Sequence, residues 1–143
     1  MSKIQSAFIA YRHTGEDHRI LEPMLSSVRD EFARLGVDAY CTFFAEDEFR
    51  DKDMGARQIM EHAFQTVEAR DLLFVVQAST KKSEGMLMEV GRFFGNKPIV
   101  VARRTTVDGT YVPEMADVTY DWSTLEELVE GIEPALSQFA DKQ

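Results

Sequence analysis

The sequence has one cysteine, no long hydrophobic run and fewer basic than acidic residues. A lone Cys41 cannot form a disulfide within the chain, and three scattered histidines offer no zinc-ligand spacing, so we expect a reducing compartment and no metal. No segment approaches the roughly 18 consecutive apolar residues of a membrane helix, so we expect no membrane partner. The formal net charge of −9 argues against binding a nucleic acid polymer, which requires a basic surface. A small anionic ligand is still allowed, because local positive groups act over a few ångströms.

Several catalytic motifs are also missing. The chain has no GxGxxG after its first apolar run and no GxxxxGK[ST], GxSxG or HExxH pattern, so dinucleotide-binding, Walker-type and serine-hydrolase chemistries lose support. We expect no organic cofactor. The segment "MSKIQSAFIAYRHTGEDHR" contains one lysine and a short apolar run, which is not typical of a signal peptide, so we expect a cytoplasmic protein.

Apolar runs and amphipathic segments alternate along the chain. At 143 residues it has the size of one compact domain, residues 1–143. The segments expected as strands are 6–12, 37–44, 71–77, 97–103 and 117–122. The segments expected as helices are 20–35, 54–69, 84–94 and a terminal helix from Ser123. This alternation predicts an α/β fold in which helices cover both faces of a five-stranded parallel sheet.

Ligands of such sheets bind beyond the carboxyl ends of the strands, where the strand order reverses. Tyr11 and Arg12 lie nearest the end of the first expected strand, and they could stack on or hydrogen-bond a planar ligand. Phe44, at the end of the second expected strand, is either a core residue or an aromatic that flanks a base.

The loop after the third expected strand, "ASTKKSEG", offers a local anion site. Ser83 is a plausible N-cap for the helix that begins at Glu84, and Lys81 and Lys82 precede it. Free backbone N–H groups at a helix start, a hydroxyl and two ammonium groups would together bind an anion. The alternative is a solvated loop with a capping serine.

Glu89 is the unusual residue of the helix that follows. At about 100° per residue, the apolar side chains of this helix form one arc. They are Met86, Leu87, Val90, Phe93 and Phe94. Glu89 falls at the edge of the arc, so we expect a partly desolvated carboxylate with a raised pKa and greater nucleophilicity. Such a group suits attack on a cationic carbon in a shielded pocket, and the alternative is a boundary glutamate paired with Arg92 or with a neighbouring loop.

The run "DLLFVVQASTKKSEGMLMEVGRFFGNKPIVV" resembles the core of the nucleoside 2-deoxyribosyltransferase family. The shared features are a strand that begins with Asp71, a polar residue and Gly85 after the loop, the E-x-G of Glu89 and Gly91, and a Lys-Pro strand from Lys97. The resemblance implies a flavodoxin-like or Rossmann-like three-layer sandwich. It also implies that Glu89 attacks the anomeric carbon and expels the nucleobase, as in a retaining glycosidase, before the ribosyl- or deoxyribosyl-enzyme ester passes to water or to a second base.

Position 83 bears on the substrate that the resemblance implies. Six residues before the nucleophile, the transferases commonly have an aspartate, whereas relatives that hydrolyse nucleoside 5′-monophosphates have a serine that contacts phosphate. Ser83 and Gly85 are therefore expected to hold the phosphate or the 5′-oxygen, and a nucleotide hydrolase is favoured over a transferase. Tyr11 and Arg12 would line the base or sugar pocket.

Two further expectations depend on the same resemblance. The family usually has an aspartate eight residues before Asp71, and this chain has Ala63 there. The candidates for its role are Glu61, His62, Asp47 and Asp51. The alternative is that no residue takes this role and the activity is weak, altered or absent. A methionine that the family supplies from a neighbouring subunit corresponds to Met115, which implies a homodimer or a higher homo-oligomer.

A second resemblance is to Toll/interleukin-1 receptor (TIR) domains. The segments "FIAYRHTGED" and "GVDAY" and the spacing from Ser83 to Glu89 are similar to their layout. Some TIR domains cleave NAD with a helix glutamate and others only mediate assembly. The alternatives are therefore an NAD hydrolase and a non-catalytic nucleotide-binding or signalling domain. The chain has Leu87 and Met88 where such domains often have an aromatic and a cysteine.

Overall fold

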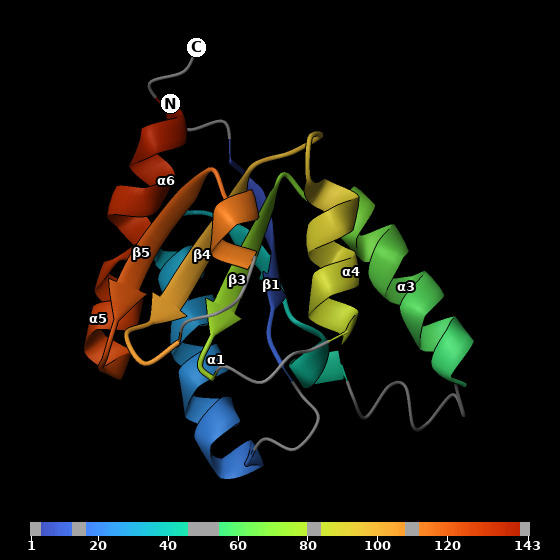
Figure 1. The fold of residues 1–143 in the computed structure, drawn as a ribbon, viewed down its shortest axis with the longest axis horizontal. Helices are drawn as coiled ribbons and strands as arrows, with labels where there is room; N and C mark the ends of the chain where they lie inside the picture. Colours follow the sequence, from blue (N-terminus) through green and yellow to red (C-terminus); the bar gives the residue numbers. More distant parts are fainter. Residues whose placement is uncertain (1–3, 13–16, 46–54, 80–83, 108–111, 141–143) are drawn as a thin grey trace.

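The computed structural model describes residues 4–12, 17–45, 55–79, 84–107 and 112–140. Five strands in these segments form one parallel sheet in the order β2-β1-β3-β4-β5 (Figure 1). The strands are β1 (Ser6–Ala10), β2 (Asp38–Tyr40), β3 (Leu72–Gln77), β4 (Ile99–Arg104) and β5 (Val118–Trp122). The predicted α/β fold with a five-stranded parallel sheet is confirmed.

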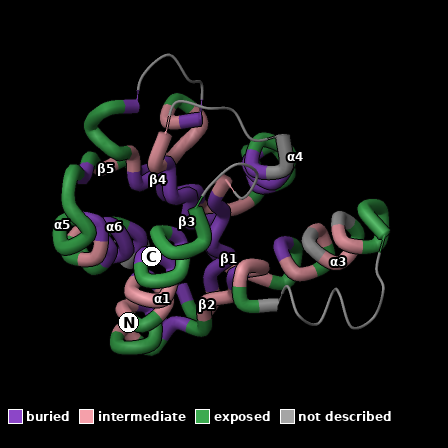
Figure 2. Tube along the Cα trace, turned by 90° about the horizontal axis from the view of Figure 1, so that it is seen from below, coloured by how far each residue is buried: buried purple, intermediate pink, exposed green. Residues whose placement is uncertain are grey.

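Helices cover both faces of this sheet and give three layers (Figure 2). They are α1 (His18–Arg34), α3 (Ala56–Glu68), α4 (Glu84–Phe93), α5 (Leu125–Glu130) and α6 (Ile132–Ala140), with the short 3-10 helices η1 (Thr42–Ala45) and η2 (Val112–Met115). The buried side chains divide into two clusters, one under α1, α5 and α6 and the other under α3 and α4. Over the described segments, no helix is both long enough and apolar enough to cross a membrane.

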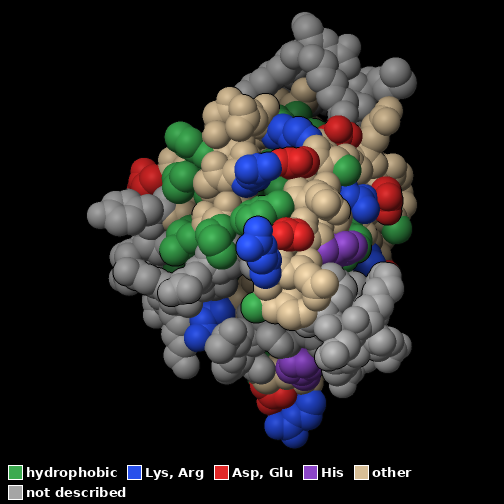
Figure 3. Space-filling model, turned by 90° about the vertical axis from the view of Figure 1, so that its right-hand side faces the viewer, with side chains coloured by type: hydrophobic (Ala, Val, Ile, Leu, Met, Phe, Trp, Pro, Cys, Tyr) green, Lys and Arg blue, Asp and Glu red, His purple; other side chains and the backbone are tan. Residues whose placement is uncertain are grey.

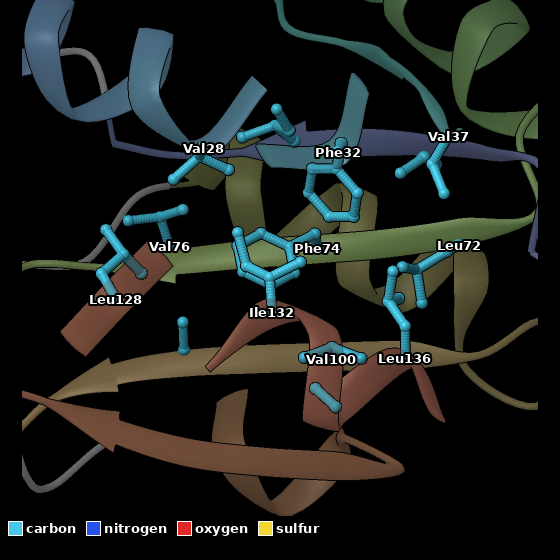
Figure 4. Close-up of a cluster of buried hydrophobic side chains, with 14 of the residues drawn as sticks. Val28, Phe32, Val37, Leu72, Phe74, Val76, Val100, Leu128, Ile132 and Leu136 are labelled. Atoms are coloured by element: carbon cyan, nitrogen blue, oxygen red, sulfur yellow. The ribbon is translucent and has the colours of Figure 1, made fainter. Parts of the chain in front are cut away.

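The strand β3 is packed from both faces of the sheet. On the first face, Phe32 of α1 meets Phe74 of β3 edge to face, with ring centroids 5.1 Å apart (Figure 4). On the second face, Val75 packs in one cluster with Val90 and Phe93 of α4. Every residue of β3 is buried, as expected for a central strand of a parallel sheet. The carboxyl end of β3 is therefore held by packing on both faces of the sheet.

The second strand is shorter than the sequence predicts. β2 pairs only with β1, over the three residues Asp38–Tyr40, and the chain then enters η1. Phe43 and Phe44, expected at the end of the strand, lie in η1 instead. Their apolar character is explained by ring contacts near the carboxyl end of β1, because Phe43 lies 6.1 Å from the Tyr11 ring centroid. The first strand also ends early, at Ala10, which leaves Tyr11 and Arg12 just beyond the sheet.

The terminal helix is divided into α5 and α6 at Gly131. A Cβ atom at this position would lie 2.3 Å from Cε2 of Tyr120. The Tyr120 hydroxyl donates to the carbonyl oxygen of Leu128 at 2.6 Å, so the ring is held in place. The close approach therefore requires glycine. The helix starts at Leu125 with Thr124 as its cap, two residues later than predicted.

Asp71 and Lys97, two residues of the run "DLLFVVQASTKKSEGMLMEVGRFFGNKPIVV", form hydrogen bonds at the amino edge of the sheet. Asp71 accepts a hydrogen bond from the backbone N–H of Gln5 at 3.0 Å. Lys97 Nζ donates to the carbonyl oxygens of Glu68, the last residue of α3, at 2.5 Å and of Arg70 at 2.7 Å. These bonds tie the starts of β1, β3 and β4 together at the edge opposite the carboxyl ends, so both residues have structural roles.

Candidate active site

The strand order reverses between β1 and β3, and the surface is hollowed where these two strands end. The hollow is lined by Tyr11 and Arg12 after β1, Leu21 and Met24 of α1, Val76 to Ser79 at the end of β3, and Met86 of α4. Tyr11 and Arg12, selected from the sequence, are thus brought together at the place where ligands of such sheets bind. Tyr11 is buried and Arg12 is half-buried.

An aromatic group continues from Tyr11 into η1. The rings of Phe43 and Phe44 are 5.2 Å apart at nearly right angles, and Phe43 is the one that contacts Tyr11. Phe44 is one step further away, with the Arg29 guanidinium 3.8 Å over its ring. Phe43 therefore lies closer to the hollow than the predicted Phe44.

Glu89 is buried in α4, with 9% of its surface exposed. It forms no hydrogen bond or ion pair with any residue that the structure describes, and burial raises the pKa of its carboxyl to about 8. The predicted desolvation of this carboxylate is therefore present. In contrast, Leu87 and Phe94, expected on the buried arc, are exposed, because Leu87 lies on the solvent side of α4 and Phe94 follows its last turn.

The alternative pairing of Glu89 with Arg92 is wrong. Arg92 forms an ion pair with Glu68 of α3, and its guanidinium lies 5.6 Å from the Phe64 ring centroid. Arg92 thus marks the flank of α4 that faces α3. At about 100° per residue, Glu89 falls between this flank and the sheet-facing side of Phe93. Its carboxylate therefore borders the space between α4, α3 and the sheet.

The candidates for the missing acid partner do not meet Glu89 in the described segments. Glu61 is 59% exposed and pairs with Arg57 at 2.9 Å. His62 lies on the β2 side of α3, where its Nε2 is 2.9 Å from the Tyr40 hydroxyl. Asp47 and Asp51 lie outside the described residues. The role of the absent aspartate is therefore unfilled among the residues described.

The predicted phosphate loop is only in part within the structure. Ser83 lies outside the described residues, as do Lys81 and Lys82. Gly85 lies in the first turn of α4, which begins at the carboxyl edge of the sheet (Figure 1). The phosphate-binding role of Ser83 and Gly85 stays a prediction.

Met115 lies at the other end of the sheet. It belongs to η2 and lines a second hollow with Phe94, Lys97, Pro98 and Asp117, near the amino ends of β4 and β5. Within one chain it therefore does not reach the hollow of Tyr11.

The face formed by α3 and α4 is shown in Figure 3, where hydrophobic side chains gather on one side. Three of the exposed large hydrophobic residues are Leu87, Met88 and Phe94.

Gln77 was not selected from the sequence. It is the last residue of β3, it is 6% exposed, and it lines the same hollow as Tyr11. Across the described part of the chain, Gln77 and Glu89 are the buried polar or charged residues. The signal in the sequence was a polar amide at the end of an otherwise apolar strand, "DLLFVVQ".

Among the described residues, no group of three potential ligands could hold a metal ion.

No protein-family model matches the chain, and no curated protein matches it. Solved structures share its fold. A CMP N-glycosidase of Clostridium botulinum aligns with a TM-score of 0.69 at 11% identity, over 91% of this chain and 98% of that one. A conserved protein of Enterococcus faecalis V583 gives 0.62 at 13% identity, over 94% and 98%. The SEFIR domain of IL-17 receptor B gives 0.54 at 11% identity, over 88% and 95%. The class defined here is a three-layer α/β domain of the flavodoxin-like or Rossmann-like kind.

Proposed function

We propose that the protein cleaves the N-glycosidic bond of a nucleoside or a nucleoside 5′-monophosphate, with Glu89 as the nucleophile. The observation that carries the proposal is a buried carboxylate, pKa about 8, in the helix that borders the hollow at the strand-order reversal. Among the described residues Glu89 has no cationic partner, and such a carboxylate is well suited to meet a cation that forms only during the reaction.

The reaction can be written with these residues. The base lies against Tyr11, and the positive charge of Arg12 attracts the anionic part of the ligand. As the bond from C1′ to the base nitrogen lengthens, positive charge develops on C1′, and the Glu89 oxygen bonds to that carbon. The base leaves with the electron pair of the broken bond and takes up a proton. Water then adds to C1′, releases Glu89 and loses a proton, or a second base takes the place of water.

The likeness in fold to a CMP N-glycosidase is compatible with this chemistry. A serine six residues before Glu89, as at Ser83, is what the resemblance to the nucleoside 5′-monophosphate hydrolases implies for a phosphorylated substrate and for hydrolysis over transfer. We also propose that the chain works as a homodimer or a larger homo-oligomer in the cytoplasm. The exposed Leu87, Met88 and Phe94 offer an apolar surface for such assembly, and Phe94 lines a hollow with Met115.

The second candidate is a TIR-like function, either NAD hydrolysis or non-catalytic nucleotide binding in signalling. The likeness in fold to a SEFIR domain favours this candidate. The absence of an acid beside Glu89 within the described segments favours its non-catalytic form. A nucleotide-binding domain needs the hollow but not the acid partner.

One chromatographic assay separates these functions. Purified protein is incubated with nucleosides, ribo- and deoxyribonucleoside 5′-monophosphates and NAD, each with and without an added acceptor base. We expect free base from the monophosphates and no new nucleotide with the acceptor. Release of nicotinamide from NAD alone would support the TIR-like hydrolase. Saturable binding with no base released would support the non-catalytic domain.

A further inference from the structure

Gln77 places an amide at the wall of the hollow. It ends β3 next to the point where strand order reverses, and it lines the hollow with Tyr11 and Arg12. With 6% of its surface exposed, the side chain is enclosed by protein. An amide offers a carbonyl acceptor and two N–H donors in a fixed plane. At this position the Gln77 amide can hydrogen-bond a ligand group that both donates and accepts hydrogen bonds.

Gln77 and Glu89 lie on the same side of the sheet, the side that α3 and α4 cover. Side chains alternate along a strand, and Leu73 and Val75 of β3 belong to the cluster under α4, so Gln77 continues that face. Met86 of α4 lines the hollow together with Gln77. Glu89 follows Met86 by three residues, about 4.5 Å further along the helix axis. The Gln77 amide and the Glu89 carboxylate therefore border neighbouring parts of the space between α4 and the sheet.

The geometry of a nucleotide says what such an amide would meet. The base projects from one face of the sugar ring, and the 2′- and 3′-hydroxyls project from the opposite face. A nucleophile that displaces the base must approach C1′ from the face of these hydroxyls. A polar side chain beside the nucleophile consequently lies next to the 2′-hydroxyl, whichever base is present.

We propose that Gln77 hydrogen-bonds the 2′-hydroxyl of the sugar and selects ribonucleotides over 2′-deoxyribonucleotides. This inference rests on the proposed function, because it takes Glu89 as the group that approaches C1′. Gln77 acts as a specificity residue and takes no part in bond breaking. A site built to bind a hydroxyl discriminates strongly against the analogue that lacks it, since the protein groups are then left unsatisfied.

The test compares wild type with Gln77→Met, which keeps the length of the side chain and removes the amide. Gln138→Met, an exposed position on α6, is the matched control. The substrates are CMP and dCMP, then AMP and dAMP. We expect wild type to favour the ribonucleotide in kcat/KM by about 100-fold, and Gln77→Met to lose most of this preference while dCMP turnover changes little. The melting temperature should stay within about 4 °C of wild type.

A binding measurement keeps the inference separate from catalysis. Titration calorimetry with CMP and dCMP, in the Glu89→Gln background, measures recognition without turnover. We expect CMP to bind about tenfold more tightly than dCMP, and Gln77→Met to abolish the difference. Selective binding without base release by wild type would contradict the proposed reaction and support the role of Gln77. Equal binding, no binding, or a preference unchanged in Gln77→Met would overturn the inference.

Discussion

Arg92 of α4 forms its ion pair with Glu68 of α3 and leaves Glu89, three residues earlier in the same helix, without a guanidinium beside it among the residues that the structure describes. Arg92 also lies over the Phe64 ring, which fixes it further on the α3 side. Burial raises the pKa of Glu89 to about 8, and no charge in the described segments offsets this rise.

The first prediction concerns the pH dependence of catalysis. Glu89 attacks only as the carboxylate, and with a pKa near 8 about one molecule in ten is ionised at pH 7. We expect kcat/KM for base release to rise about tenfold per pH unit below pH 8 and to level off above it. A rate that is flat or falls between pH 6 and 8 would show that the ionised Glu89 is not required.

A substitution at Glu68 tests the electrostatic cause of that profile. In Glu68→Gln the guanidinium of Arg92 loses its partner and can turn toward Glu89, which would favour the ionised form. The midpoint of the pH–rate profile should move to lower pH. The double variant Glu68→Gln with Arg92→Met is the control and should keep the midpoint of wild type. Equal shifts in both proteins would exclude Arg92 as the cause.

The raised pKa also predicts how stability depends on pH. The folded state keeps the Glu89 proton up to about pH 8, whereas the unfolded chain loses it near pH 4.5. The unfolded state therefore binds fewer protons between these values, and the stability of wild type should fall as pH rises from about 5 to 8. Glu89→Gln has no charge to bury, so it should gain roughly 3 to 5 kcal/mol over wild type at pH 9. Thermal or urea unfolding at pH 5 and pH 9 measures this gain.

Glu130→Gln, at an exposed position in α5, is the control for this measurement. It should unfold like wild type at both pH values. If Glu89→Gln gained no stability between pH 5 and pH 9, the folded protein would already hold an ionised Glu89.

Two glycines predict opposite effects of the same substitution. Gly131→Ala would place a methyl group against the Tyr120 ring, which its hydroxyl bond to Leu128 holds in place, and should destabilise the protein by about 1–3 kcal/mol. Gly91→Ala, inside α4, would have no described atom within 4 Å of the added carbon apart from its chain neighbours and its own helix backbone, so it should stabilise the protein by about 0.5–1 kcal/mol. Urea unfolding measures both, and equal effects would contradict the packing described around Gly131.

The assignment of Met115 to a neighbouring subunit predicts complementation. Met115→Ala and Glu89→Ala each damage the site, but in different chains of one assembly. Mixing them after subunit exchange should restore about a quarter of wild-type activity if the unit is a dimer. Met115→Leu, which keeps the volume, controls for packing in the hollow beside Phe94. No recovery in a mixture shown to contain both chains would place Met115 outside the active site.

The sequence predicts most of the fold, because local signals mark its elements. Buried strands read as apolar runs, and Gly36 and Gly95, with φ of 79° and 83°, end α1 and α4 where expected. The short β2 and the break at Gly131 were not predicted. Both depend on contacts made after folding, such as that of Tyr120, which no local pattern reveals.

The sequence predicts only part of the candidate site, because its other features also depend on contacts made after folding. Helix phase alone indicates a partly desolvated Glu89 at the edge of the apolar arc, and the structure buries it further. The choice of Arg92 between Glu89 and Glu68 depends on how α3 lies against α4, which is a tertiary property. Gln77 gave a weak signal, a polar residue at a strand end, whose meaning depends on the hollow beside it.

The central claim is that Glu89 carries the bond-breaking step. Its most direct test is the rate of base release from nucleoside 5′-monophosphates at pH 8 by Glu89→Gln, compared with wild type and Glu130→Gln, all shown to be folded. We predict that Glu89→Gln loses at least about a thousandfold in kcat/KM while Glu130→Gln stays within about twofold of wild type. Release by Glu89→Gln within about tenfold of wild type would contradict the account.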